Sequence, residues 1–273
     1  ICKMRIGNRI FDTDRSVYIM GILNVTPDSF WDGGQYRGMD KALRHVEDMI
    51  EDGADIIDIG GESTRPGASP VDAADEIERV MPVIEAVKER FDIPISLDTY
   101  KNTVAWAGIG AGVDMINDVW GLKGDERMAE VVAQSHKPVC IMHNRTKAVY
   151  NDVVTNVISD LEESVNIAIK AGISKEDIMI DPGIGFAKDT EQNLKLMAHL
   201  KDMAGLGYPV LLGTSRKSVI GNTLDLPVGE RLEGTLATAA WGMLNGVSFV
   251  RVHDVKEHAR LIRMIDAIRS RCS

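Results

Sequence analysis

Residues 139–181 read VCIMHNRTKAVYNDVVTNVISDLEESVNIAIKAGISKEDIMID and contain one complete strand–helix–strand repeat. The short apolar runs 139–142 and 178–180 are typical of strands that are buried on both faces. The segment between them carries apolar residues at the spacing of one helix face: Val154, Val157, Ile158, Leu161, Val165 and Ala168. This alternation is the unit from which parallel sheets are built.

The same repeat extends along the chain in both directions. Apolar, β-branched runs occur at 18–23, 55–59, 95–97, 114–116, 139–142, 178–180, 210–212 and 249–252. Pro82 interrupts one of the helical patterns, so we expect that helix to start late or to kink. Eight alternations in about 250 residues predict a parallel (β/α)8 barrel. An open doubly wound sheet competes, but it usually has fewer units, and no G-x-G-x-x-G follows the first strand.

Residues 1–16 precede the first repeat and predict a small hairpin. Its strands would be 4–6 and 9–11, with Gly7-Asn8 as the turn. We expect this hairpin to cap the bottom of the barrel. No Pro/Ser-rich linker or charge block divides residues 1–273, so we expect one domain. The first residue is Ile1 rather than Met, so we expect that the chain is either trimmed or cut from a longer polypeptide.

The composition excludes several classes of protein. Hydrophobic residues make up 44% and charged residues 26%, as in ordinary globular proteins. The formal net charge of -10 disfavours a nucleic-acid partner. No run approaches the length of a membrane span. Cys2, Cys140 and Cys272 form no C-x-x-C pair, and their odd count favours a reducing, cytoplasmic location.

Polar residues follow nearly every apolar run, where a barrel of this type carries its active site. They are Asn24, Glu62, Asp98, Asn117, Asp118, His143, Asn144, Asp181, Ser215, Arg216, Lys217, Arg251 and His253. For any one of these residues, an ordinary strand-to-loop transition explains the polar side chain about as well as a functional role does. It explains the whole set less well, because loop ends usually carry Ser, Gly and Lys.

The set contains two kinds of chemistry. Some members offer mainly acceptors, which suit a flat heterocycle with an amino-pyrimidinone edge: Asp98, Asn117 and Asp181. Others offer donors and positive charge, which suit a phosphate or pyrophosphate: Lys217, Arg251 and His253. Asn24 could bind Mg²⁺, because substrate phosphates often supply the remaining oxygen ligands of this ion. Met142 is expected near a ligand ring. The set therefore predicts a phosphorylated heterocyclic substrate.

Other sequence motifs give no competing function. The six histidines lack the spacing of a zinc site, and no G-x-S-x-G hydrolase motif occurs. Gly213-Thr-Ser-Arg-Lys-Ser lacks the glycine spacing of a P-loop, which argues against a nucleotide hydrolase.

Several longer motifs occur in a fixed order along nearly the whole chain. They are Gly21-Ile-Leu-Asn-Val-Thr-Pro-Asp-Ser-Phe-Trp-Asp-Gly-Gly34, Asp58-Ile-Gly-Gly-Glu-Ser-Thr-Arg-Pro-Gly67, Ser96-Leu-Asp-Thr99, Ile116-Asn-Asp-Val119, Met142-His143, Asp181-Pro-Gly-Ile-Gly-Phe186, Thr214-Ser-Arg-Lys-Ser218 and Arg251-Val-His-Asp254. In this order the chain resembles the dihydropteroate synthase family of folate biosynthesis.

The resemblance implies an activity. Members of the family join a dihydropterin pyrophosphate to p-aminobenzoate, which gives dihydropteroate and releases pyrophosphate. They use Mg²⁺, are usually homodimers and are the target of sulfonamides, which mimic p-aminobenzoate. The resemblance thus implies a transferase with small-molecule substrates and no nucleic-acid or membrane partner.

The resemblance also implies roles for individual residues. The pterin would be held by Asp98, Asn117, Met142, Asp181, Gly185, Lys217 and Arg251. The pyrophosphate would be held by Asn24, Arg251 and His253, with Mg²⁺ on Asn24. The p-aminobenzoate site would be formed by Thr64, Arg65, Pro66, Phe186 and Ser218. Two loops would close over the substrates and carry Phe30, Asp32 and Arg65. Catalysis would fall to Asp98, Lys217, Arg251 and His253 together with these loop residues.

Two alternatives remain at this point. A pterin-dependent methyltransferase domain has similar strand ends but uses a corrinoid partner, and the Glu-Ser-Thr-Arg-Pro and Ser-Arg-Lys-Ser stretches argue against it. A catalytically silent pterin-binding protein is the other, and the intact set of polar strand ends argues against that.

Overall fold

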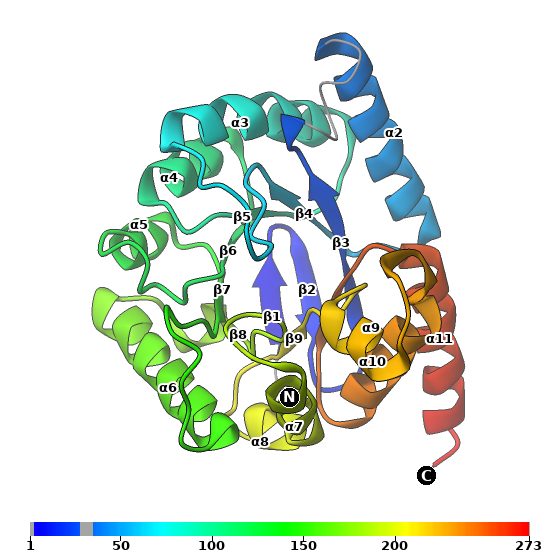
Figure 1. Cartoon of the computed structure of the whole chain (residues 1–273). Helices are drawn as coiled ribbons and strands as arrows, with labels where there is room; N and C mark the ends of the chain where they lie inside the picture. The colour runs from blue at the N-terminus through cyan, green and yellow to red at the C-terminus, as the bar shows by residue number, and fades with distance from the viewer. Residues whose placement is uncertain (1–2, 28–34, 273) are drawn as a thin grey trace.

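The computed structural model describes residues 3–27 and 35–272, and within them eight parallel strands form a barrel (Figure 1). The strands are β3 (Tyr18–Asn24), β4 (Ile56–Gly60), β5 (Ile95–Asp98), β6 (Met115–Asp118), β7 (Val139–Met142), β8 (Ile178–Asp181), β9 (Leu211–Leu212) and β10 (Phe249–Val252). Their order is β8-β7-β6-β5-β4-β3-β10-β9, and a parallel bridge between Ile180 and Val210 joins the two ends. The prediction of a (β/α)8 barrel is confirmed.

Helices surround the strands as an outer ring (Figure 1). They are α2 (Gln35–Asp52), α3 (Ala73–Arg90), α4 (Asn102–Ala111), α5 (Met128–Ser135), α6 (Val153–Ala171), α7 (Thr190–Ala198), α8 (Leu200–Ala204), α9 (Ser218–Leu224), α10 (Leu232–Leu244) and α11 (Val255–Arg269), with short 3₁₀ turns at η1 (Lys175–Asp177) and η2 (Val228–Glu230). None of the helices in these two ranges is both long and apolar enough to cross a membrane.

Helix α3 differs from its prediction, because it starts at Ala73, well before Pro82. The expectation of a late start is wrong. Asp75 and Glu76 in the first turn stabilise the positive end of the helix dipole. The helix also buries one face, which carries Val80, Val83, Ile84 and Val87. These contributions outweigh the one backbone hydrogen bond that a proline removes.

The predicted hairpin is present and consists of β1 (Lys3–Ile6) and β2 (Arg9–Asp12), paired antiparallel. Gly7 in its turn has a φ of 61°, and a Cβ there would lie 2.8 Å from Asp114 Oδ1. The turn therefore requires glycine both for its backbone conformation and for its close approach to the barrel.

The hairpin fills the lower end of the barrel, where the strands begin. Its buried side chains form one apolar cluster with inward-facing residues of the strands: Met4, Ile6, Phe11, Met20, Ile56, Met115, Cys140, Met179, Leu211 and Phe249. The Phe11 ring lies 4.8 Å from the Tyr18 ring and 5.7 Å from the Phe249 ring, centroid to centroid. Ser248 Oγ also donates a hydrogen bond to Thr13 O at 2.9 Å.

Acidic side chains tie the strand starts together at this lower end. Asp55 Oδ2 accepts from the backbone N–H of Ile19 at 2.8 Å, and Asp114 Oδ2 accepts from that of Ile95 at 2.8 Å. Strands β4 and β6 begin one residue after these carboxylates, which is why the predicted runs 55–59 and 114–116 start slightly early.

Alternation along each strand changes the barrel interior from apolar below to polar above. Ile56 of β4 belongs to the hairpin cluster, whereas Ile57 and Ile59 pack in the cluster that includes helix residues. Asp58 and Gly60 therefore share the inward face with Ile56. In the strand register Asp58 is opposite Ser96, and Gly60 is opposite Asp98. The polar strand ends thus meet inside the barrel at its carboxyl end.

Candidate functional site

A connected charged cluster lies inside the carboxyl end of the barrel. Arg251 Nε donates to Asp58 Oδ2 at 2.7 Å, and Arg251 Nη2 lies 3.4 Å from Asp98 Oδ2. Asn117 Nδ2 donates to the same Asp58 oxygen at 3.3 Å. The cluster brings together three of the predicted site residues, on β5, β6 and β10, with Asp58 between them.

The ionised forms of two carboxyl groups in this region, Asp98 and Asp181, are disfavoured. Burial and the nearby negative charge of Asp58 raise the pKa of Asp98, against the opposing effect of Arg251. Burial also raises the pKa of Asp181 at the end of β8, although Lys217 lowers it. Both carboxyls would be better stabilised as ions if a positively charged ligand arrived.

Lys217 joins the loop after β9 to the loop after β8. Its Nζ donates to Ile184 O at 2.6 Å and lies 4.9 Å from the centre of the Phe186 ring. Burial lowers the pKa of Lys217 to about 8, against the effect of Asp181. Gly185 has a φ of 88°, and a Cβ there would lie 3.1 Å from Lys217 Cδ. Gly185, Phe186 and Lys217 therefore form one contact surface beside Asp181.

The loop after β8 is held by Lys188, a residue that the sequence analysis did not assign. Lys188 Nζ donates to Gly183 O at 2.9 Å and Phe186 O at 2.8 Å, and lies 2.9 Å from His143 Nδ1. These contacts use all three donors of the ammonium group. The position of Lys188, two residues after the motif that ends at Phe186, is the sequence signal that could have identified it.

His143 completes this anchor as a neutral ring. Burial lowers the pKa of Lys188 to about 7. The protonated amine only donates, so His143 Nδ1 then accepts and Nε2 carries the proton, which faces Asp160 Oδ2 at 2.7 Å. Burial and the charge of Lys188 lower the pKa of His143 to about 4. Asp160 is in turn paired with Arg145 Nε at 2.7 Å. His143 thus acts in the loop anchor, away from the Asp58 cluster.

His253 follows β10 and is also neutral. Ser215 Oγ lies 2.7 Å from His253 Nδ1 and accepts from the backbone N–H of His253 at 3.2 Å. Burial and the charges of Arg216, Arg251 and Arg65 lower the pKa of His253 to about 4. His253 therefore offers a ligand an N–H donor, where the sequence analysis expected positive charge as well.

The loop after β4 carries Thr64, Arg65 and Pro66 and is closed at its base. Glu62 Oε1 accepts from the backbone N–H of Val71 at 2.6 Å and pairs with Lys101 Nζ at 3.3 Å. Arg65 and Pro66 are exposed and Thr64 is half-buried. Neither these residues nor the exposed Ser218 at the start of α9 hydrogen-bonds to the Asp58 cluster within the described ranges.

The remaining predicted residues lie at other strand ends or outside the structure. Asn24 is the exposed last residue of β3 and is opposite Gly60 in the register. Met142 ends β7, is buried and is opposite Asp181. Phe30 and Asp32 lie outside the described residues. Within residues 3–27 and 35–272, no group of three or more His, Cys, Asp or Glu side chains is arranged to hold a metal ion.

Comparison with known proteins shows the family of this chain. The profile of a family described as pterin binding enzyme matches residues 20–253. A dihydropteroate synthase of Clostridium beijerinckii is 53% identical over 97% of this chain and 99% of its own length. That of Bacillus subtilis is 55% identical over 92% of this chain and 88% of its own length. The chain belongs to the dihydropteroate synthase family.

Solved structures of this family superimpose closely. A dihydropteroate synthase of Xanthomonas albilineans with 4-aminobenzoic acid has a TM-score of 0.93 at 41% identity and covers 98% of each chain. One of Yersinia pestis in complex with a sulfonamide drug has a TM-score of 0.91 at 39% identity and covers 98% of this chain and 99% of its own.

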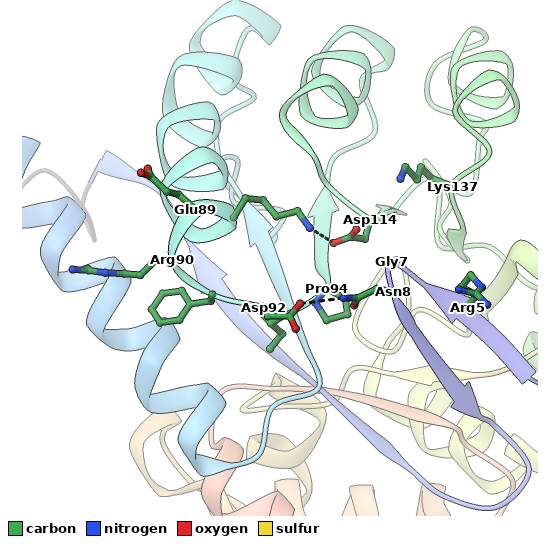
Figure 2. Close-up of a pocket in the computed structure, with 12 residues that line it drawn as sticks. Arg5, Gly7, Asn8, Glu89, Arg90, Asp92, Pro94, Asp114 and Lys137 are labelled. Atoms are coloured by element: carbon green, nitrogen blue, oxygen red, sulfur yellow. Dashed lines mark hydrogen bonds and ion pairs between the residues drawn. The ribbon is translucent and has the colours of Figure 1, made fainter.

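The opposite end of the barrel, where the strands begin, carries a surface groove. An open groove of about 770 Å³ lies between the hairpin turn, the end of α3 and the starts of β5 and β6. Figure 2 shows the residues that line it. Lys88 pairs with Asp114 at 2.7 Å, and Asn8 donates to Asp92 Oδ1 at 3.2 Å. The buried carboxylate of this groove, Asp114, is thus already paired, and the carboxyl end of the barrel remains the candidate functional site.

Proposed function

We propose that the chain joins the ring methylene of a dihydropterin pyrophosphate to the amine nitrogen of p-aminobenzoate. The carbon–oxygen bond to pyrophosphate breaks and the amine loses one proton, which gives dihydropteroate and pyrophosphate. The observation that carries the proposal is the meeting of acceptors and cations inside one barrel end. Asp98 and Asn117 are neighbours in the strand register, and Arg251 contacts Asp98 directly. Relatives at 53% and 55% identity that are named dihydropteroate synthase support the same reaction.

The pterin ring would lie between the strand ends and the loop after β8. Asp98, Asn117 and Asp181 would accept hydrogen bonds from its amino-pyrimidinone edge, and Lys217 would donate to it. Met142, Gly185 and Arg251 would contact the flat faces of the ring. Glycine at position 185 fits this role, because a side chain there would displace Lys217.

The pyrophosphate would lie toward β3 and β10. Arg251 and His253 would donate to its oxygens, and Asn24 would contribute one oxygen ligand to Mg²⁺. One neutral protein oxygen suits an ion that is otherwise bound by phosphate oxygens and water. When bound, the ion would neutralise charge on the leaving pyrophosphate.

The p-aminobenzoate would bind nearer the mouth of the barrel. Phe186 would contact its ring, Ser218 and the start of α9 would face its carboxylate, and Thr64, Arg65 and Pro66 would cover it. The loop after β3, with Phe30 and Asp32, would complete the closed site. Arg65 already lies near enough to His253 to lower its pKa, which supports a role for Arg65 at the join between the two substrates.

These residues favour a dissociative reaction. The bond between the ring methylene and the pyrophosphate oxygen would break first, because the cation that forms is delocalised into the pterin ring. Asp98 and Asp181, whose ionised forms are disfavoured in the free protein, would stabilise this cation. Arg251 and His253 would hold the leaving group. The amine of p-aminobenzoate is uncharged at neutral pH and needs positioning rather than a general base.

Turnover is the direct test of this proposal. The purified chain is mixed with dihydropterin pyrophosphate, p-aminobenzoate and Mg²⁺, and release of pyrophosphate is followed with and without chelator. We expect release that depends on both substrates and stops with chelator. Pterin binding without any release would instead identify a silent pterin-binding protein.

A titration tests the division into two substrate sites. We expect pyrophosphate with Mg²⁺ to tighten p-aminobenzoate binding by about 1–3 kcal/mol, because the anion neutralises the cations that keep the loops apart. Equal affinity in both titrations would mean that the second site is preformed.

The proposal includes assembly and location. Two neighbouring helices expose large apolar side chains that would suit a homodimer interface: Trp241 and Leu244 on α10, and Met264 and Ile268 on α11. Light scattering on the chain and on Met264→Glu tests this, and a dimer in the first with a monomer in the second is expected. Cys140 and Cys272 are free thiols, which supports a reducing, cytoplasmic location.

A further inference from the structure

Asp58 opens the second long motif of the sequence, and no role has been assigned to it. It lies in the middle of β4, on the inward face, with no accessible surface. A carboxylate inside a barrel is costly unless it is paired, and apolar residues fill the neighbouring layers. Its presence therefore calls for an explanation in terms of the groups that it contacts.

Both groups that Asp58 contacts belong to the proposed substrate site. Its Oδ2 accepts from Arg251 Nε at 2.7 Å and from Asn117 Nδ2 at 3.3 Å. Its Oδ1 is buried and accepts no hydrogen bond from any residue that the structure describes. Arg251 and Asn117 are thus the described groups that satisfy this carboxylate.

The hydrogen bond to Asp58 fixes the orientation of the Asn117 side-chain amide. An ionised carboxylate only accepts hydrogen bonds, so the amide must direct its NH₂ group to Asp58. The Asn117 carbonyl oxygen is then the atom of the amide that remains for a ligand. Without Asp58, the amide could rotate and present a donor to the same ligand atom.

We propose that Asp58 is a positioning residue that makes Asn117 an acceptor and holds the Arg251 guanidinium in place, so that the pocket selects heterocycles with a hydrogen-bond donor edge. The inference rests on the proposed function and deepens it. Asp58 sets the polarity of the pterin pocket without touching the pterin.

The surrounding charges give a second consequence. Burial raises the pKa of Asp98 most, the negative charges of Asp58, Glu76 and Asp118 raise it further, and Arg251 opposes them. Loss of the Asp58 charge should let Asp98 ionise at lower pH. A change in the pH dependence of turnover would therefore accompany the loss of amide orientation.

The main variant is Asp58→Asn, which keeps the shape and removes the charge. Calorimetry with a phosphate-free pterin should show affinity reduced about tenfold or more. The KM for p-aminobenzoate at saturating pterin substrate should change little, and the acid limb of the pH–rate profile should move to lower pH. Ser96→Ala is the matched control, since Ser96 is buried opposite Asp58 and bonds to neither Asn117 nor Arg251. It should leave pterin affinity unchanged.

Exchanging the residues at positions 58 and 117 conserves charge and separates the two roles of Asp58, which are to orient the Asn117 amide and to hold Arg251. Asn117→Asp alone places two carboxylates face to face and should weaken pterin binding strongly. Adding Asp58→Asn should restore pterin binding, because the new amide donates to the carboxylate at 117, which still accepts from the ligand. Turnover should stay low, because Arg251 has lost the closer of the two carboxylate partners that the structure describes and keeps only Asp98 at 3.4 Å. This pair also tests the inference if Asp58→Asn alone fails to fold.

The outcomes are distinct. Unchanged pterin affinity in Asp58→Asn, or a swap that binds pterin no better than Asn117→Asp, would overturn the inference. If the unaltered chain binds pterin but shows no turnover, the proposed function fails, and the binding measurements still decide the role of Asp58.

Discussion

The lower and upper halves of the barrel interior are built from the same strands but differ in chemistry. Below, β4 and β10 contribute Ile56 and Phe249 to the cluster that the hairpin closes. Above, the same two strands contribute Asp58 and Arg251, each two residues farther along its strand. A shift of two residues keeps a side chain on the same face of a strand. The same strands thus contribute apolar packing at one end of the barrel and the candidate functional site at the other.

The two halves also differ in how their charges are satisfied. Asp114 at the lower end accepts from a backbone N–H and pairs with Lys88. Asp98 at the upper end is buried near other carboxylates, and its pKa is raised as a result. The carboxylate of Asp114 is thus stabilised as an ion by its partners, whereas the ionised form of Asp98 is disfavoured in spite of its contact with Arg251.

The largest effect should come from the lower end. Phe11→Ala should lower the free energy of unfolding by about 3–5 kcal/mol, because it leaves a cavity against Tyr18 and Phe249. The KM values should not change. Urea unfolding and steady-state kinetics check this, with Ile10→Ala as control, since Ile10 lies beside Phe11 and is 56% exposed. Equal destabilisation by both variants would contradict a packed hairpin.

Asp98→Asn should give the opposite result at the upper end. Turnover should fall about 100-fold to 1,000-fold, because a charge that stabilises the cation is lost. Stability should rise. The folded state keeps a proton on Asp98 at pH values where the unfolded chain has released it, so ionisation of Asp98 opposes folding as the pH rises above the ordinary carboxyl range. Unfolding curves at two pH values measure this difference.

Asp114→Asn is the matched control for that prediction. It should lower stability by about 1–3 kcal/mol through the loss of a buried, charged acceptor, and it should leave turnover unchanged. If Asp114→Asn reduced turnover as much as Asp98→Asn, the division between the two ends of the barrel would not hold.

Lys188→Met should have an intermediate effect that is confined to one substrate. The loop after β8 loses three hydrogen bonds, and Phe186 is no longer held in place. We expect the KM for p-aminobenzoate to rise about tenfold. Pterin affinity should change much less. Lys195→Met is the control, because Lys195 is an exposed lysine of the following helix. A larger loss of pterin affinity than of p-aminobenzoate affinity would place Lys188 in the pterin pocket instead.

The smallest effect concerns pH. Because the pKa of Lys217 is lowered to about 8, kcat/KM for the pterin substrate should fall above that pH as the ammonium loses its proton. Lys217→Arg should lower activity but remove this limb, since a guanidinium stays charged. Lys188→Met should retain the limb. A pH profile of the three proteins distinguishes which lysine titrates.

The sequence predicts the fold well because strands buried on both faces appear as continuous apolar runs. Strand ends could be located from the polar residue that follows each run, such as Asp98 after Leu97 or Asp181 after Ile180. Residues of a recognisable motif could be assigned in the same way. These features are local in the chain.

Contacts between distant residues could not be read in this way. Asp58 and Arg251 are 193 residues apart, and Lys188 and His143 are 45 residues apart. Neither pairing has a signal in local composition or periodicity. The neutral state of His253 likewise depends on Arg216 and Arg251 nearby in space and on burial. Partner identity and ionisation are properties of the folded site, so they require the structure.

The hairpin also sets the timing of folding during synthesis. Thr13 and Ser248 form a hydrogen bond although they are 235 residues apart. Met4 and Phe11 leave the ribosome long before β10, so the cluster that buries them is complete only when almost the whole barrel has been translated. Closing so long a loop is slow, and apolar side chains that wait can bind other nascent chains. A circular permutant that starts at β3 and carries the hairpin after α11 would synthesise both partners together and should escape that delay.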